Sequence, residues 1–132
     1  MSSGTLGTAL GGDVLRKADS GGCFLCEDPG VDQPRVDAFE VSPAGPMFGP
    51  KLMRAASAVA AAEDALLAEE GLTGEAFRRG GGETEGARRA YRFRAAALEL
   101  AAEGADCTLT FELPKGSYAT VLLRELMKDY IR

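Results

Sequence analysis

Alternating apolar and polar positions near the end of the chain predict a strand over residues 107–113. Every second residue from Cys107 to Leu113 is apolar, and two threonines and a glutamate lie between them, so the apolar side chains share one face. Pro114 has no N–H for a ladder and Gly116 permits a tight turn. Ser117 suits the N-cap of a helix whose apolar residues recur at helical spacing from position 119 to 130. The pattern therefore predicts a strand, a sharp turn and a helix.

The first half of the chain alternates short strands with turn signals. Residues 13–17 and 23–27 predict a hairpin, and Asp28-Pro29-Gly30 predicts a turn. Residues 33–39 fit either a short helical turn or an extended segment. Three prolines and two glycines in residues 42–50 predict a rigid loop without secondary structure.

A long apolar stripe over residues 51–70 predicts the longest helix, which Gly71 ends. A small helix is expected over residues 73–79, followed by a flexible break at the three glycines 80–82.

Two further segments lie between that break and the last strand. Residues 87–93 alternate as a strand does, whereas the alanine content of residues 95–103 favours a helix that Gly104 ends.

Composition places the chain among small proteins with a modest core. It has 132 residues and a formal net charge of −5, and it is expected to be one domain or part of a larger one. The sequence contains no apolar run of membrane-spanning length and no secretory leader, which predicts a cytoplasmic protein with three reduced cysteines.

The pair Cys23 and Cys26 invites a metal or redox interpretation, which the rest of the sequence disfavours. The chain has no histidine and only one further cysteine, Cys107, so a four-ligand zinc site would need an unusual carboxylate. Residues three apart on a strand also point to opposite faces. We therefore expect small buried hydrophobes and no metal.

The turn before the last helix is a candidate binding site. It places Tyr118 in the first helical turn, beside backbone N–H groups that favour a phosphate or a polarised carbonyl oxygen. An aromatic face next to such donors can seat a flat base. The alternative is structural: Tyr118 packs the turn onto the core and Ser117 only caps the helix.

Three stretches of the sequence carry a family resemblance. Residues 111–127, with Leu113-Pro114, Gly116-Ser117-Tyr118-Ala119-Thr120 and Arg124-Glu125-Leu126-Met127, resemble the C-terminal signature of the TruD-type tRNA pseudouridine synthases. Residues 43–51 resemble a segment of the domain inserted into that family's catalytic fold. Gly12-Asp13-Val14-Leu15 followed by Gly21-Gly22 and Phe24 resembles a third family segment, in the same order.

The resemblance implies an α+β fold in two parts. The Gly-, Ser- and Thr-rich composition of residues 1–11 predicts a flexible lead or the end of something longer, and we favour the second because the resemblance already applies from about Gly4. Residues 12–86 would be most of the inserted domain, a small mixed domain of hairpin and helices. Residues 87–132 would supply the strand, turn and helix at the C-terminal end of the catalytic pseudouridine synthase fold. The chain would then be about the C-terminal third of a typical member.

The resemblance also implies an activity, the isomerisation of a uridine in tRNA to pseudouridine without metal or organic cofactor. In the family an aromatic residue at the position of Tyr118 contacts the target uracil, and Ser117 and Gly116 are its expected neighbours. The family's catalytic aspartate lies in an N-terminal motif rich in Gly, Lys and Asp that no part of this chain matches. No aspartate here is therefore assigned a catalytic role, and the chain alone is expected to be inactive, with the missing N-terminal part of the synthase as a possible partner.

The tRNA partner requires cations that face phosphate, which a net charge of −5 neither supplies nor excludes. The candidates are Arg88, Arg89, Arg92, Arg94, Lys115 and Arg124. Two alternatives remain open: a stand-alone RNA-binding module, and a fragment that completes a partner and exposes the apolar faces of its last strand and helix.

Overall fold

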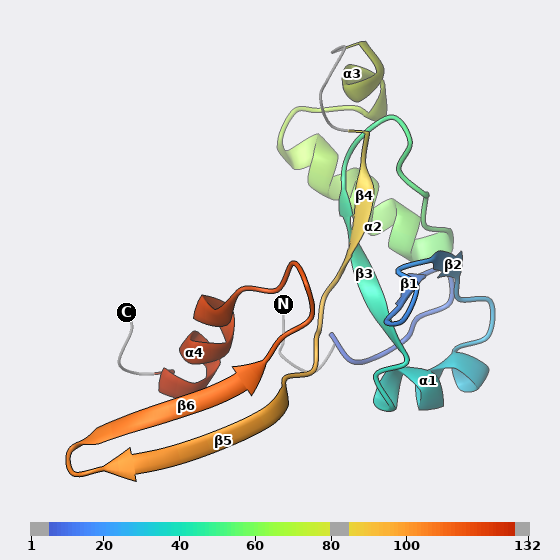
Figure 1. Cartoon of the computed structure of the whole chain (residues 1–132). Helices are drawn as coiled ribbons and strands as arrows, with labels where there is room; N and C mark the ends of the chain where they lie inside the picture. Colours follow the sequence, from blue (N-terminus) through green and yellow to red (C-terminus); the bar gives the residue numbers. More distant parts are fainter. Residues whose placement is uncertain (1–5, 80–84, 129–132) are drawn as a thin grey trace. The chain divides into compact units, whose positions relative to one another are not determined.

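The computed structural model describes residues 6–79 and 85–128, and the chain divides into two compact units (Figure 1). The first unit comprises Met1–Arg92 and the second Phe93–Arg132. The described residues form two antiparallel sheets and four helices, which confirms the α+β class. No helix among these residues is long and apolar enough to cross a membrane.

The first unit is built on a four-stranded antiparallel sheet in the order β2-β1-β3-β4 (Figure 1). Its elements are β1 (Val14–Lys17), β2 (Cys23–Leu25), α1 (Pro29–Asp37), β3 (Val41–Met47), α2 (Ser57–Glu69), α3 (Gly74–Arg79) and β4 (Ala87–Ala90). The predicted hairpin is confirmed, with Val14 opposite Leu25. The break expected at residues 80–82 lies outside the described residues.

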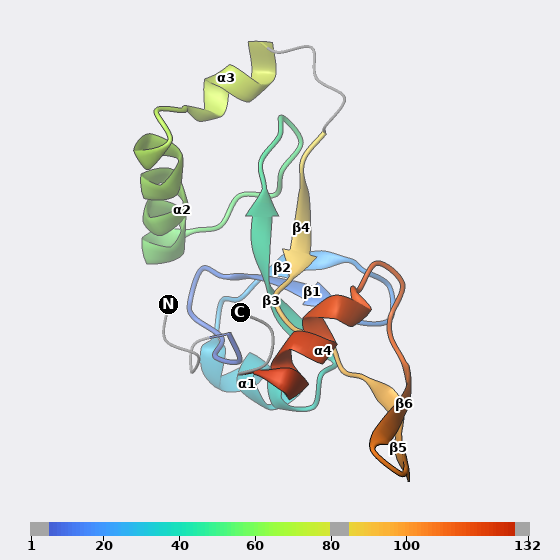
Figure 2. The ribbon, with the colours of Figure 1, turned by 90° about the vertical axis from the view of Figure 1, so that its left-hand side faces the viewer.

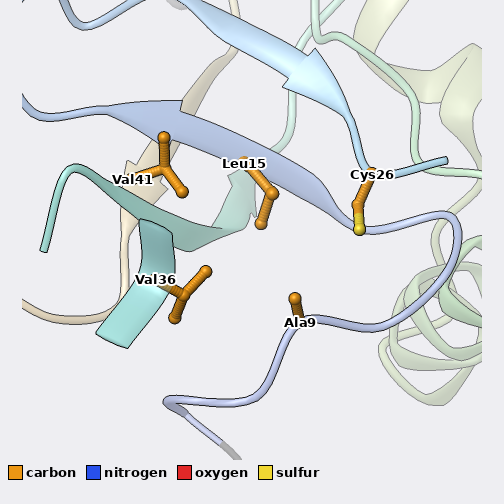
Figure 3. Close-up of a cluster of buried hydrophobic side chains, with 5 residues drawn as sticks. All are labelled: Ala9, Leu15, Cys26, Val36 and Val41. Atoms are coloured by element: carbon orange, nitrogen blue, oxygen red, sulfur yellow. The ribbon is translucent and has the colours of Figure 1, made fainter. Parts of the chain in front are cut away.

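A small hydrophobic core lies between β1, β3 and α1. Figure 3 shows its members, Ala9, Leu15, Cys26, Val36 and Val41, each at most 4% exposed. Ala9 comes from the segment whose composition predicts a flexible lead or the end of something longer. A flexible lead is wrong for residues 7–10, because the side-chain amide of Gln33 accepts from the backbone N–H of Ala9 at 2.8 Å and donates to the carbonyl of Gly7 at 2.9 Å.

The prediction of a structureless loop over residues 42–50 is wrong, since most of it is β3. Residues 41–43 of β3 pair with β1 and residues 44–47 pair with β4. The prolines are tolerated because each half of the strand pairs on one side only. Pro43 accepts a hydrogen bond from the N–H of Tyr91 at 2.9 Å but cannot return one, and β4 ends at Ala90.

Helix α1 begins at Pro29, inside the stretch of residues 28–30 for which the sequence predicts a turn. Asp28 is its N-cap and accepts from the backbone N–H of Gly30 at 2.9 Å, while Pro29 occupies the first helical position. The Asp-Pro-Gly sequence is thus a helix start, in which proline loses no hydrogen bond.

Helix α2 is six residues shorter at its start than the predicted helix. The N–H of Ala56 donates to the carbonyl of Gly12 at 2.9 Å, so this residue stays extended, and Ser57 adopts a φ of 52°. A side chain at Gly12, whose φ is 91°, would collide with the carbonyl oxygen of Ala56. This close approach holds the segment before α2 against the start of β1.

Arg88 on β4 ties α2 to the sheet from inside the first unit. Its guanidinium donates to both carboxylate oxygens of Glu63 on α2, at 2.5 and 2.9 Å. It also donates to the backbone carbonyls of Met53, at 2.7 and 2.9 Å, and Ala44, at 3.2 Å. Figure 2 shows α2 alongside β3 and β4, the arrangement that these bonds fix.

The second unit consists of β5 (Ala96–Glu103), β6 (Asp106–Glu112) and α4 (Ala119–Met127). The helix predicted over residues 95–103 is wrong, because this segment pairs with β6 as β5. Gly104, with a φ of 64°, makes the tight turn between the strands. A partner strand in reach thus overrides the helix preference of alanine.

No residue among the described part of the second unit, 93–128, is buried. All eight residues of β5 are exposed, and α4 contains no buried residue. The predicted alternation is present as partial burial, since Leu109, Phe111 and Leu113 are half-buried while the residues between them are exposed. A core this incomplete cannot offset the conformational entropy of folding.

The buried ion pair predicts a large loss of stability on a small chemical change. We expect Glu63→Gln to lower the free energy of unfolding by roughly 3–5 kcal/mol, because it leaves the Arg88 cation buried without a counter-charge. Urea unfolding followed by circular dichroism measures this. Lys51→Gln is the control, since Lys51 and Glu85 form an exposed pair that contributes at most about 1 kcal/mol. Equal effects of the two substitutions would contradict the structural role of Arg88.

Cys26 predicts a loss of stability in alkaline solution. Burial, then the hydrogen bond and charge of Asp32, raise the pKa of the thiol from 9.0 to about 11. The folded chain therefore keeps a proton that the unfolded chain loses, so this contribution is intact below pH 9 and disappears as the pH rises towards 11.

We expect Cys26→Ala to flatten the fall in the free energy of unfolding between pH 9 and 11. The exposed Cys107 supplies the control variant, Cys107→Ala, which should leave that fall unchanged. Parallel pH curves for Cys26→Ala and the original chain would show that this thiol does not cause the effect.

Candidate functional site

The turn between β6 and α4 has the expected course, with one change at the helix start. Gly116 has a φ of 88°, and the N–H of Ser117 donates to the carbonyl of Pro114 at 3.0 Å. The N-cap is Tyr118 rather than Ser117, and Tyr118 makes no side-chain capping bond. The prediction that Ser117 caps the helix is therefore wrong by one residue.

Tyr118 stands at the surface of the second unit. Its side chain is 59% exposed, Ser117 is half-buried and Gly116 is exposed. Tyr118 precedes the first turn of α4, whose N–H groups have no carbonyl four residues earlier in the helix; that of Val121 donates to the carbonyl of Tyr118 at 3.1 Å. The turn thus brings the three predicted substrate-binding residues together, with an aromatic ring beside backbone donors. Such a site can stack a flat base and donate to its carbonyl oxygens.

Two of the six candidate RNA contacts serve the fold of the first unit. Arg88 is 3% exposed and spends its donors on Glu63 and on backbone carbonyls, so it has no face for a phosphate. Arg92 donates to the carbonyl of Val36 at 2.7 Å, and its guanidinium lies 4.5 Å from the centre of the Phe39 ring. We therefore remove Arg88 from the candidate RNA contacts. Most of the Arg92 guanidinium is occupied by its contacts with Val36 and Phe39.

The other four candidates are exposed. Arg89 lies on β4 of the first unit, whereas Arg94, Lys115 and Arg124 belong to the second. Arg88 is buried and Arg89 exposed because neighbouring residues of a strand such as β4 face opposite sides.

The cysteines form no metal site within the described residues. Cys26 is buried in the core and Cys23 is half-buried on β2. No group of three or more Cys, Asp or Glu side chains in residues 6–79 and 85–128 is arranged to hold a metal ion.

The sequence interpretation missed a cavity of about 210 Å³ in the first unit. Phe48 and Phe77, 29 positions apart, line it together with Arg54 and Arg78. The sequence contains one local hint of this site, because arginines such as Arg54 and Arg78 are expected at the surface. Nothing in the sequence around Phe48 or Phe77 indicates that their rings come together.

Comparison with known proteins identifies the family. The family profile described as "TruD: tRNA pseudouridine synthase D (TruD)" matches residues 1–126, so the chain belongs to the TruD family of tRNA pseudouridine synthases. This confirms the resemblance found in the sequence.

The matching relatives are considerably longer than this chain. The tRNA pseudouridine synthase D of Anaeromyxobacter sp. (strain Fw109-5) is 58% identical over 97% of the chain, which covers 36% of that relative. That of Syntrophotalea carbinolica is 44% identical over 94% of the chain, which covers 31% of it. The chain thus spans about a third of the length of the curated relatives it matches.

A solved structure shares the fold. The crystal structure of the putative tRNA pseudouridine synthase D from Methanosarcina mazei superposes with a TM-score of 0.74 at 24% identity, over 93% of this chain and 32% of that one. At this identity the likeness concerns the fold.

Proposed function

We propose that this chain forms part of a tRNA pseudouridine synthase that converts a uridine in tRNA to pseudouridine. The observation that carries the proposal is the match to the family over residues 1–126, which includes β6, the turn around Tyr118 and α4 up to Leu126. Residues 12–86 would correspond to most of the family's inserted domain and residues 87–132 to the C-terminal part of its catalytic domain, so β4 and the second unit would belong to the latter. Such an enzyme acts where tRNA is found, which favours the cytoplasm.

Tyr118 is proposed as a contact of the target uracil. The base must leave its stack to react, which costs a few kcal/mol and calls for stacking and hydrogen-bonding partners in return. The exposed ring of Tyr118 can stack on the base, and the backbone around Gly116 and Ser117 can form hydrogen bonds with it. Arg89, Arg94, Lys115 and Arg124 remain candidate contacts to the tRNA backbone.

The catalytic aspartate would come from outside this sequence. The reaction exchanges the bond from ribose to the uracil nitrogen for a bond to a ring carbon, with no net oxidation. It needs a carboxylate near the ribose, which the family places in a motif that this chain does not contain. The isolated chain is therefore proposed to be inactive, and activity would require the part that the longer relatives possess.

The exposed second unit supports a completing role over a stand-alone RNA-binding module. Its described residues include no buried side chain, and Leu98, Leu100 and Leu126 are 54%, 71% and 55% exposed. Apolar surfaces of this kind are covered in stable proteins, and the matched relatives have about twice this chain's length of further sequence to cover them.

A chimera tests the proposed activity. The matched segment of the Anaeromyxobacter sp. (strain Fw109-5) relative is replaced by this chain, and pseudouridine in a tRNA transcript is measured by mass spectrometry. We expect the chimera to form pseudouridine and the isolated chain to form none. A folded chimera without activity, beside an active parent relative, would contradict the proposal.

Substitutions at Tyr118 in the chimera test the uracil contact. We expect Tyr118→Ala to lower kcat/KM by roughly tenfold to a hundredfold, since stacking of a base on an aromatic ring contributes about 1–3 kcal/mol. Tyr118→Phe keeps the ring and should retain most activity. Thr110→Ala, at an exposed position of β6, is the control. Unchanged activity of Tyr118→Ala would remove Tyr118 from the site.

Hydrogen exchange tests whether the second unit is completed by another part. We expect amides of β5, β6 and α4 to exchange rapidly in the isolated chain, because few buried contacts oppose local opening. In the chimera the same amides should be strongly protected, while β1 and β3 change little. Strong protection in the isolated, monomeric chain would contradict the need for completion.

A further inference from the structure

The 210 Å³ cavity of the first unit lies where α2, α3 and the segment after β3 meet. Its walls include Phe48, Leu52, Arg54, Leu67, Phe77 and Arg78. Pockets for drug-sized ligands are typically about 300–1,000 Å³, so this one suits a single small planar group. Because all its residues belong to one compact unit, its shape does not depend on where the second unit lies.

One wall of the cavity is aromatic. The rings of Phe48 and Phe77 stack with centroids 6.0 Å apart and an angle of 22° between their planes, an offset arrangement that such pairs prefer. Both residues are half-buried, and Leu67 beside them is 5% exposed. A flat group entering here meets an aromatic surface formed by the segment after β3 and by α3.

The cavity is also positively charged. Arg54 and Arg78 line it, and none of the lining residues is acidic. Arg54 is paired with Asp64 at 2.9 Å, and Arg79 is paired with Glu75 at 3.0 Å. The guanidinium of Arg78, in contrast, makes no side-chain hydrogen bond or ion pair with residues 6–79 or 85–128. A guanidinium that no carboxylate of the described residues neutralises, beside an aromatic wall, matches a phosphate next to a base.

We propose that this cavity binds one nucleotide of a single-stranded segment of the RNA substrate. The base stacks on the wall formed by Phe48 and Phe77, and its phosphate binds the guanidinium of Arg78. The inference rests on the proposed function, because that function supplies an RNA ligand. The residues of the cavity belong to the first unit, whereas Tyr118 belongs to the second.

Binding of a single-stranded probe to the full 132-residue chain tests the proposal. The probe is a fluorescent ten-nucleotide polyuridylate, and Kd is measured by anisotropy at several salt concentrations. We expect Phe77→Leu, which keeps an apolar side chain but removes the aromatic face, to weaken binding about tenfold. We expect Arg78→Gln to weaken it several-fold and to reduce the dependence of log Kd on log salt by about one unit.

Arg79→Gln is the matched control, because it removes the same charge from the next residue of α3. It should have at most half the effect of Arg78→Gln on log Kd. Equal effects of the two variants would indicate attraction by net charge alone and would overturn the proposal. So would aromatic NMR signals of Phe77 that do not shift when the probe binds, because an empty or protein-filled cavity gives that result. Thermal unfolding of each variant establishes that α3 remains folded.

The chimera separates this inference from the proposed function. Arg78→Gln there should raise KM for tRNA and leave kcat unchanged, because the cavity binds and does not react. Full pseudouridine formation with an unaltered KM would overturn the cavity proposal and leave the enzyme proposal standing. An inactive chimera together with Arg78-dependent probe binding would do the reverse.

Discussion

The first unit depends on one buried cation. The side chain of Arg88 is 1% exposed, and an unpaired charge at such a position would be very costly. A planar guanidinium with five donors can satisfy a carboxylate and several carbonyls at once, and Arg88 does so with Glu63, Met53 and Ala44. These partners come from α2, the segment before it and β3. A single side chain thus holds α2 and the segment before it on the sheet, and both of these contribute residues to the wall of the cavity.

The electrostatics around this pair have a second consequence. The pKa of the Asp13 carboxyl is raised, mainly by burial. The N–H of Leu10 and the charge of Arg88 lower this pKa, and the charge of Glu63 raises it. The same two carboxylates, after burial, raise the pKa of the Tyr91 hydroxyl. Two buried acidic groups, Asp13 and Glu63, therefore share the charge of Arg88. Replacing that arginine by lysine would lose the planar fork that bonds the carboxylate and the backbone carbonyls together.

The elements that could be predicted from the sequence are those whose signals are local. The hairpin of β1 and β2 has its glycine turn, and β6 with α4 has alternation, a proline stop and a helical stripe in sequence. The errors fall where a distant partner decides. β3 contains Pro43 and Pro46, and it is a strand because β1 and β4 pair with its two halves on opposite sides. β5 is rich in alanine, and it is a strand because β6 lies opposite. Arg88 is of a residue type that usually lies at the surface, and it is buried here because Glu63, 25 residues away, supplies a buried counter-charge.

The burial of Arg88 also shows that net charge alone is a poor guide to RNA binding by this chain. Binding to RNA depends on cations that face phosphate and release counterions, not on the sum over the chain. Arg88 and Arg92 form part of the fold, Lys51 and Arg54 lie in surface ion pairs, and four of the predicted contacts remain exposed. With a net charge of −5, this chain can offer RNA a few placed contacts but not a broad positive surface. Under the proposed function, the electrostatic share of tRNA affinity would come mainly from parts of the synthase outside this sequence, and the residues here would position particular nucleotides.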